Sequence, residues 1–206
     1  MSRSFVFARL PLHTAEAQQD LLRVVKPVTE FAFTGEPGVT KYAALTAQGD
    51  HALYMLEEYV DQAASDSHIA TEGVQNFVKW LGTPGHVNGT PRVWFTVPTE
   101  YVHLSAPLAD VKEPYVVVTE YNFPGGASAS LKLFEAPFAS AKERGALLYG
   151  VYTEKSNANV VLTAEVYSSA SGYVGPAAAA QGEVASTAVV EVKYGFLHKR
   201  GAKSSL

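Results

Sequence analysis

The amino-acid sequence predicts an α+β fold made of two βαββαβ units in tandem, and three observations support this. The pair Glu57-x-Tyr59 recurs as Glu165-x-Tyr167, with both members displaced by the same interval. Around each pair, a strand, a proline-bearing helix, a hairpin and a final aromatic strand follow in the same order. The chain of 206 residues is long enough for two small domains.

The first unit, residues 1–104, begins with an aromatic and β-branched strand and continues with an amphipathic helix. Thr14, Asp61 and Thr71 each stand where an N-cap is needed, because their side-chain oxygens can accept an orphan backbone N–H. Pro27 should end or kink the first helix near residue 26, since its ring clashes with the preceding turn. Strands are expected at 5–10, 39–46, 53–60 and 92–97, and helices at 14–26, 62–70 and 71–81.

The second unit, residues 105–206, restarts this order after a connector expected at 98–114. A helix is expected over 128–144, with Pro137 inside it and Gly145 in the position of a C-cap glycine. Residues 171–180 are small and low in complexity and predict a poor helix or a lid, and residues 199–206 a frayed polar tail. Strands are expected at 115–121, 147–152, 160–167 and 189–196.

The composition is that of an ordinary globular protein, with 47% hydrophobic and 17% charged residues. The net charge of -4 and the lack of a basic patch argue against nucleic-acid binding. The absence of cysteine excludes disulfides, thiolate metal sites and cysteine nucleophiles. No apolar run is long enough for a signal peptide or a membrane span, so we expect a cytoplasmic protein with no membrane partner.

One spaced set of residues runs through the first unit: Glu36-Pro37-Gly38, Tyr42, Glu57-x-Tyr59, Asp61, Ala64-x-x-x-His68 and Phe77. This set resembles the antibiotic biosynthesis monooxygenase family of dimeric α+β-barrel proteins. The match extends over roughly residues 5–97, and the second unit resembles the fold in outline only. There, Gly145-Ala146-Leu147 replaces the Glu-Pro-Gly triplet and Pro176 stands at the position of His68.

This resemblance implies two ferredoxin-like units whose antiparallel sheets pack face to face as an intrachain α+β barrel. The second unit would be a degenerate copy that completes the barrel. A protein of this kind would be a monomer with an intrachain barrel or a homodimer. Family members include cofactor-free oxygenases, and fold relatives include decarboxylases, cyclases, isomerases and haem-degrading enzymes, so the fold alone does not settle the function.

His68 is the main catalytic candidate, with Tyr59 and Glu57 beside it in the predicted site. His68 and Ala64 share one helix face because they are four residues apart. A neutral imidazole could take a phenolic or enolic proton near neutral pH, and Glu57 could orient it. The structural alternative is a histidine that serves the fold alone, with Glu57 as a hydrogen-bond acceptor or a solvated strand residue.

Aromatic residues could line a pocket for a small, flat, hydrophobic substrate. As most aromatic residues at such positions belong to the core, each one has a structural alternative. No two histidines, and no histidine with a carboxylate, have metal-ligand spacing, and no phosphate or flavin loop occurs. We therefore expect no cofactor and no metal, with dioxygen as co-substrate. The substrate-binding candidates are Tyr42, Tyr54, Phe77, Trp80 and Trp94.

The leading functional hypothesis is a cofactor-independent monooxygenase acting on an enolisable secondary metabolite. An anthrone-like aromatic polyketide and a cyclopentanone, jasmonate-like fatty acid are the two substrate types considered. A non-oxidative lyase, decarboxylase or cyclase could use the same pocket and the same His68. A non-catalytic binding or stress protein is the third hypothesis, and a haem-degrading enzyme using Trp80 is the fourth.

Overall fold

The computed structural model describes residues 3–199 apart from 106, 107, 109 and 178–182, and its fold is the predicted α+β fold of two ferredoxin-like units. The strands follow the order β1-β3-β2-β8-β5-β7-β6-β4 in a closed barrel. The chain divides into two compact units, of which the first comprises the residues up to Trp94 and returns at Val192. The second comprises Phe95–Glu191. Among the described residues, no helix is both long and apolar enough to cross a membrane.

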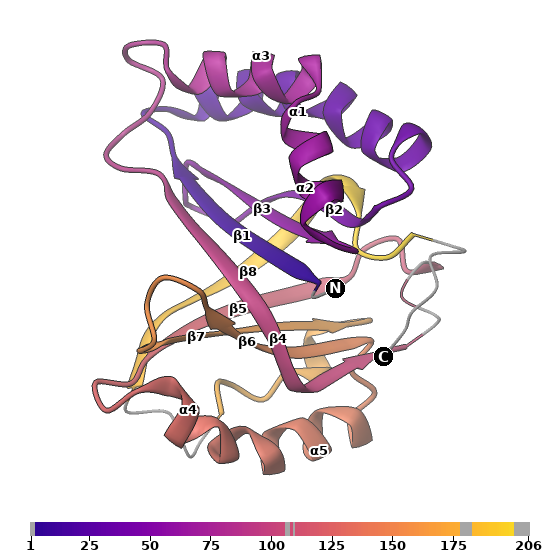
Figure 1. Ribbon diagram of the computed structural model, residues 1–206, viewed down its shortest axis with the longest axis vertical. Helices are drawn as coiled ribbons and strands as arrows, with labels where there is room; N and C mark the ends of the chain where they lie inside the picture. Colours follow the sequence, from indigo (N-terminus) through magenta and orange to yellow (C-terminus); the bar gives the residue numbers. More distant parts are fainter. Residues whose placement is uncertain (1–2, 106–107, 109, 178–182, 200–206) are drawn as a thin grey trace. The chain divides into compact units, whose positions relative to one another are not determined.

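The first unit places three helices on one face of an antiparallel sheet in which β3 lies between β1 and β2 (Figure 1). The core between helices and sheet is apolar, with Leu21, Val25 and Leu53 fully buried. Its elements are β1 (Ser4–Pro11), α1 (Ala15–Gly35), β2 (Val39–Thr46), β3 (Ala52–Tyr59), α2 (Gln62–Ile69) and α3 (Glu72–Leu81). The predicted N-caps are confirmed, since the side chains of Thr14, Asp61 and Thr71 accept backbone N–H groups of α1, α2 and α3.

The first helix was predicted to kink or end near residue 26. It does not end there, because α1 continues through Pro27 to Gly35. A proline inside a helix costs about 3 kcal/mol, because it removes one hydrogen bond and crowds the preceding turn. The apolar face continues past the proline, and Val28 and Ala32 are 3% and 0% exposed. Burial of this last stretch against the sheet offsets the cost.

The second unit places its short helices on one face of a sheet that includes β5, β6 and β7 (Figure 1). Along β7, Glu165 lies opposite Val117 of β5 and Tyr149 of β6. The elements are β4 (Arg92–Leu104), β5 (Tyr115–Asn122), α4 (Ala127–Ser130), η2 (Leu131–Phe134), α5 (Glu135–Glu143), β6 (Leu148–Glu154), β7 (Val160–Tyr167), η3 (Ala170–Gly172) and β8 (Val184–Phe196).

Three predictions for this part of the chain are wrong. The helix expected over 128–144 is broken into α4, η2 and α5, and Pro137 falls in the first turn of α5, where its missing N–H is tolerated. The expected connector is strand up to Leu104, with a register shift between Pro98 and Val102 that accommodates the proline. The last strand begins at Val184, earlier than predicted.

Two predictions about less regular segments fall partly outside the described residues. The poor helix or lid predicted at 171–180 contains η3, which ends at Gly172, and its last residues are not described. Of the polar tail predicted from residue 199, the structure describes Lys199, which donates to two backbone carbonyls at the end of α1.

Candidate functional site

His68 and Glu36 form a buried pair of side chains in the first unit. The Nδ1 atom of His68 lies 2.8 Å from Oε2 of Glu36, and the side chains are 2% and 9% exposed. Because an ionised carboxylate can only accept, the proton of a neutral imidazole in this contact belongs on Nδ1. The other ring nitrogen, Nε2, is then left with a free lone pair.

The sequence positions His68 by docking α2 tightly against the start of β2. A Cβ atom on Gly38 would lie 2.5 Å from the Cβ atom of Ala64, so only glycine allows this approach. Asp61 caps α2 by accepting the N–H of Ala64 at 2.9 Å. Ala64 and His68 share one face of α2, so the contact at Gly38 turns the imidazole toward Glu36.

Two tyrosine rings flank the imidazole. The ring centroids of Tyr42 and Tyr59 lie 4.6 and 5.6 Å from that of His68. Tyr42 lies opposite Glu57 across the β2–β3 ladder, and the Tyr59 hydroxyl donates to Oε2 of Glu57 at 2.6 Å. Burial raises the pKa of both phenols and of the Glu57 carboxyl. The phenols are therefore neutral at physiological pH and act as hydrogen-bond donors and not as bases.

The hydrogen bond to His68 comes from Glu36, whereas Glu57, the predicted orienting residue, lies within electrostatic reach of the imidazole. The Glu57 carboxylate accepts the hydroxyl of Tyr59, and Glu36 is the residue that contacts the imidazole. Glu36 is the C-cap of α1 and belongs to the Glu-Pro-Gly triplet, whose contribution to the site was missed. The available signal was that Glu36 belongs to the same spaced set as His68, since the two residues are far apart in sequence.

The five predicted substrate-binding aromatics do not form one group. Tyr42 joins the His68 site, whereas Phe77 and Trp80 lie on α3 and are partly buried against the core. Tyr54 points to the opposite face of the sheet, where Phe7 lies between it and Trp94 with centroids at 6.1 and 5.4 Å. The Tyr54 hydroxyl is used by Asp50 and Arg9. The separation follows from the strand alternation, which places Tyr54 and Tyr59 on opposite faces.

A lysine from the far end of the chain holds the end of α1 beside Glu36. The Nζ atom of Lys199 donates to the carbonyls of Ala32 and Glu36 at 3.1 and 2.9 Å. A cation at this place satisfies carbonyls that have no partner within the helix and opposes the negative end of the helix dipole.

Replacing Lys199 with methionine should lower the free energy of unfolding by about 1–2 kcal/mol, because both carbonyls lose a charged donor. Urea unfolding measures the change. Lys26→Met is the matched control, since Lys26 pairs with Glu30 on the exposed face of α1, and this substitution should leave the free energy of unfolding nearly unchanged. Equal effects of the two substitutions would contradict this role of Lys199.

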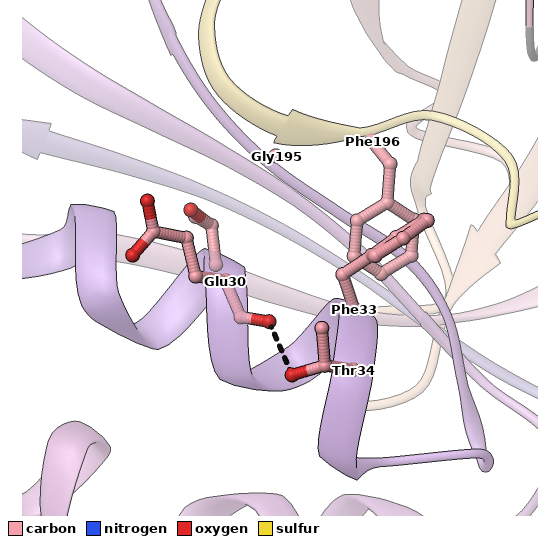
Figure 2. Close-up of a pocket in the computed structure, with 6 residues that line it drawn as sticks. Glu30, Phe33, Thr34, Gly195 and Phe196 are labelled. Carbon is pink, nitrogen blue, oxygen red and sulfur yellow. Dashed lines mark hydrogen bonds between the residues drawn. The ribbon is translucent and has the colours of Figure 1, made fainter.

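A hollow of the first unit lies between α1 and the end of β8, and His68 is not among the residues that line it. It measures about 340 Å³ and is lined by Thr29, Glu30, Phe33, Thr34, Gly195 and Phe196. Figure 2 shows Phe33 and Phe196 ring against ring, with the Thr34 hydroxyl donating to the carbonyl of Glu30 at 3.0 Å. A second hollow, of about 300 Å³, follows the exposed side of α1 and also lacks the predicted site residues.

The second unit repeats the tyrosine–glutamate–tyrosine arrangement of the first. Tyr149 lies opposite Glu165 across the β6–β7 ladder, and the Tyr167 hydroxyl donates to Oε2 of Glu165 at 2.7 Å. The histidine is absent, and Arg144 is the C-cap of α5 as Glu36 is of α1. The structural counterpart of Glu36 is thus Arg144. In the sequence, Glu36 was matched to Gly145, which is one residue later.

The buried Glu165 should make the stability of the second unit fall as pH rises. Burial raises the pKa of this carboxyl to about 7, from 4.5 in the unfolded chain. The folded state therefore binds more protons than the unfolded state between these values. Glu165 thus contributes about 3 kcal/mol to the free energy of unfolding at low pH. This contribution is complete below pH 4.5 and is lost as pH rises through 7.

Unfolding of the wild type and of Glu165→Gln should be compared from pH 4.5 to 8. The glutamine cannot ionise, so the stability difference between the two proteins should shift toward the variant as pH rises. Glu143→Gln, on the exposed end of α5, is the control and should leave the wild-type pH dependence unchanged. A difference that is constant across this range would contradict the raised pKa.

Known proteins resemble this chain in two ways: a family model matches its first unit, and solved structures share its overall fold. Residues 5–80 match the model of the family described as antibiotic biosynthesis monooxygenase. This match covers β1 to α3 almost completely and includes Glu36 and His68. No curated protein matches the chain.

Three solved structures are similar over nearly the whole chain. A candidate monooxygenase from Fusobacterium nucleatum has a TM-score of 0.74 at 16% identity, covering 97% of this chain and 98% of its own. One from Lactobacillus acidophilus NCFM has a TM-score of 0.68 at 16% identity, covering 93% of each chain. An anthrone oxidase-like protein has a TM-score of 0.65 at 13% identity, covering 100% and 96%. At these identities the likeness extends to the fold.

Proposed function

The chain carries an antibiotic biosynthesis monooxygenase domain in its first unit, and from this premise we propose a cofactor-independent monooxygenase with its active site at His68. The substrate class we propose is a small, hydrophobic, enolisable compound, such as an anthrone-like polyketide or a cyclopentanone fatty acid. Dioxygen is the co-substrate. The domain match supports the reaction type, and the substrate class rests on the chemistry of the site.

The contact between His68 and Glu36 is the observation that carries this proposal. With Nδ1 held by the carboxylate at 2.8 Å, Nε2 is a base of fixed orientation. Glu36 also stabilises the imidazolium that forms when Nε2 takes a proton, because an opposite charge nearby favours the charged form. The flanking rings of Tyr42 and Tyr59 exclude water and offer flat apolar surfaces.

The proposed reaction starts when Nε2 removes a proton from a carbon next to a carbonyl. The resulting carbanion is delocalised as an enolate and is electron-rich enough to react with dioxygen. One oxygen atom becomes bonded to the carbon and the other leaves as water, so a methylene becomes a carbonyl. The four electrons lost by the carbon reduce both oxygen atoms, and no further reductant is consumed.

Entry of the substrate requires a local opening, since His68 is only 2% exposed. Helix α2 is the element suited to this movement, because Ser65 and His68 are its only buried residues. An element with so few buried contacts opens at a lower free-energy cost than the core strands. Its displacement would uncover the imidazole and leave the sheet intact.

Oxygen uptake by the purified protein tests the proposal directly. A panel of anthrones and cyclic ketones should include at least one substrate that drives uptake, and labelled dioxygen should introduce one labelled atom into the product. Absence of uptake across the panel would overturn the proposal. Turnover without incorporation of label would instead identify a non-oxidative lyase, decarboxylase or cyclase that shares the deprotonation step.

A binding or stress protein remains the alternative that the burial of His68 favours. In that case the pair of His68 and Glu36 would serve to dock α2 and nothing else. Such a protein would lose stability on substitution of His68 but would have no activity to lose.

A further inference from the structure

We propose that Lys199 is a positioning residue for the candidate site, because it holds the backbone of Glu36 in the place from which the Glu36 carboxylate contacts His68. The inference rests on the proposed function, since the contact matters for catalysis only if His68 is the base. It adds a residue from the end of the chain to a site whose other members lie between residues 36 and 68.

Glu36 is the first residue after α1, and its backbone has left the helical conformation, with a φ of -120° and a ψ of 87°. Two donors bind its carbonyl oxygen. They are the N–H of Val39 at 3.1 Å and the Nζ atom of Lys199 at 2.9 Å. The carbonyl and the side chain of Glu36 extend from the same Cα atom, so a restraint on the carbonyl also limits where the carboxylate can lie.

Lys199 connects the two sides of the turn Glu36-Pro37-Gly38. Its Nζ atom also donates to the carbonyl of Ala32 in α1 at 3.1 Å. Its backbone N–H donates to the carbonyl of Thr40 in β2 at 3.2 Å. The turn that carries the Glu36 carboxylate is therefore held by one residue that bonds to the helix before it and to the strand after it.

The position of Lys199 is itself fixed by apolar packing. Leu197, two residues earlier, is buried. The Nζ atom lies over the rings of Phe33 and Phe196, 5.7 and 5.8 Å from their centroids, and these two rings pack against each other (Figure 2). A cation in this place is attracted by the faces of the rings. A lysine held in this way can restrain Glu36 and does not simply follow its movements.

The ammonium group of Lys199 also acts on the charge of Glu36. Burial lowers the pKa of Lys199 and the Glu36 carboxylate opposes this shift, so the two groups are within electrostatic reach. The attraction is mutual, and the positive charge favours the ionised form of Glu36. Because an ionised carboxylate can only accept, the shared proton stays on Nδ1 of His68, and Nε2 is free to act as the base.

A role in stability alone is the alternative, since a cation at the C-terminal end of a helix is favourable in any protein. That role requires a contact with any of the last carbonyls of α1 and predicts nothing about His68. In this chain, Lys199 bonds to the carbonyl of the residue whose side chain contacts His68. The positioning role explains this choice of partner.

NMR of the full-length protein with nitrogen-15-labelled histidine tests the proposal without substrate. At neutral pH, the Nδ1 proton of His68 should give a signal far downfield that exchanges slowly with water, because it is bonded to a buried carboxylate. The absence of the signal from His68→Ala assigns it. Lys199→Met should speed the exchange by about tenfold or more, because the contact opens more often. Lys199→Arg keeps the charge and the donors and should retain the wild-type signal.

Gly49→Ala is the matched control for a general loss of stability. Gly49 lies in the turn between β2 and β3, at the other end of this hairpin from Glu36, so its substitution should leave the His68 signal unchanged. An unchanged signal in folded Lys199→Met, or an equal change in both variants, would overturn the proposal. Should Lys199→Met fold poorly, Lys199→Gln serves the same test, because its amide carries no charge and should also speed the exchange.

The rate of oxygen uptake gives a second readout. Lys199→Met should lower kcat about three- to tenfold and leave KM within about twofold, because Lys199 acts on the base and does not bind the substrate. Faster exchange together with an unchanged kcat would overturn the positioning role. Absence of uptake in the wild type would overturn the proposed function alone, and NMR would still decide whether Lys199 holds the contact between Glu36 and His68.

Discussion

His68→Ala is expected to lower the rate of oxygen consumption by about 10²–10⁴-fold, because the substitution removes the proposed base. The measurement is the initial rate of uptake with the best substrate of the panel. Unfolding in urea should be measured alongside, since removal of a buried side chain also costs stability. The catalytic role predicts loss of rate under conditions in which the variant remains folded.

Glu36→Gln separates positioning from catalysis. The glutamine can still contact Nδ1 but cannot stabilise an imidazolium, so the rate should fall about tenfold and the pH dependence of the rate should change. His86→Ala is the histidine control, as His86 stacks on Trp80 and bonds its carbonyl away from the site. A folded His68→Ala protein with the wild-type rate would contradict the catalytic role and leave only the docking of α2.

Gly195→Ala is expected to be among the most destabilising single substitutions in the first unit, at about 3 kcal/mol or more. A Cβ atom at Gly195 would lie 1.9 Å from the backbone carbonyl oxygen of Tyr42, which cannot move without shifting β2. The φ angle of +93° adds strain for any residue with a side chain. Thermal and urea unfolding measure the loss.

Gly49→Ala is the matched control for this effect. Gly49 has a φ angle of +75°, but no atom lies within 4 Å of a Cβ atom built there. The control therefore carries the backbone strain without the collision and should cost about 1–2 kcal/mol. Similar losses for the two alanine variants would show that strain alone, and not the approach to Tyr42, makes Gly195 necessary.

Local sequence signals predicted the local structure well. Each of Thr14, Asp61 and Thr71 was expected to cap a helix because a short side-chain oxygen precedes an amphipathic run, and each does so. The helix end predicted at Pro27 was wrong because only the free-energy cost of a proline in a helix can be judged locally. The free energy gained by burying Val28 and Ala32 depends on packing against the sheet, which local sequence patterns do not describe.

The candidate site was harder to predict because its members come from distant parts of the chain. Nothing local indicates that Glu36 meets His68, or that Lys199 reaches the end of α1. Strand alternation could have separated Tyr54 from Tyr59, since neighbours on a strand at odd spacing face opposite sides. The prediction grouped Tyr54 and Tyr59 because both are aromatic, but the fold places them on different faces of the sheet.

The tyrosine–glutamate–tyrosine arrangement is common to both units, so each unit serves as an internal reference for the other. Tyr42, Glu57 and Tyr59 in one copy have counterparts in the other, whereas His68 does not. What both copies retain is expected to belong to the shared scaffold, and what only one copy holds to its specialised task. Engineering of new activity should therefore start at the segment after β3 or β7, where the two units differ, and leave the shared carboxyl–phenol contact in place.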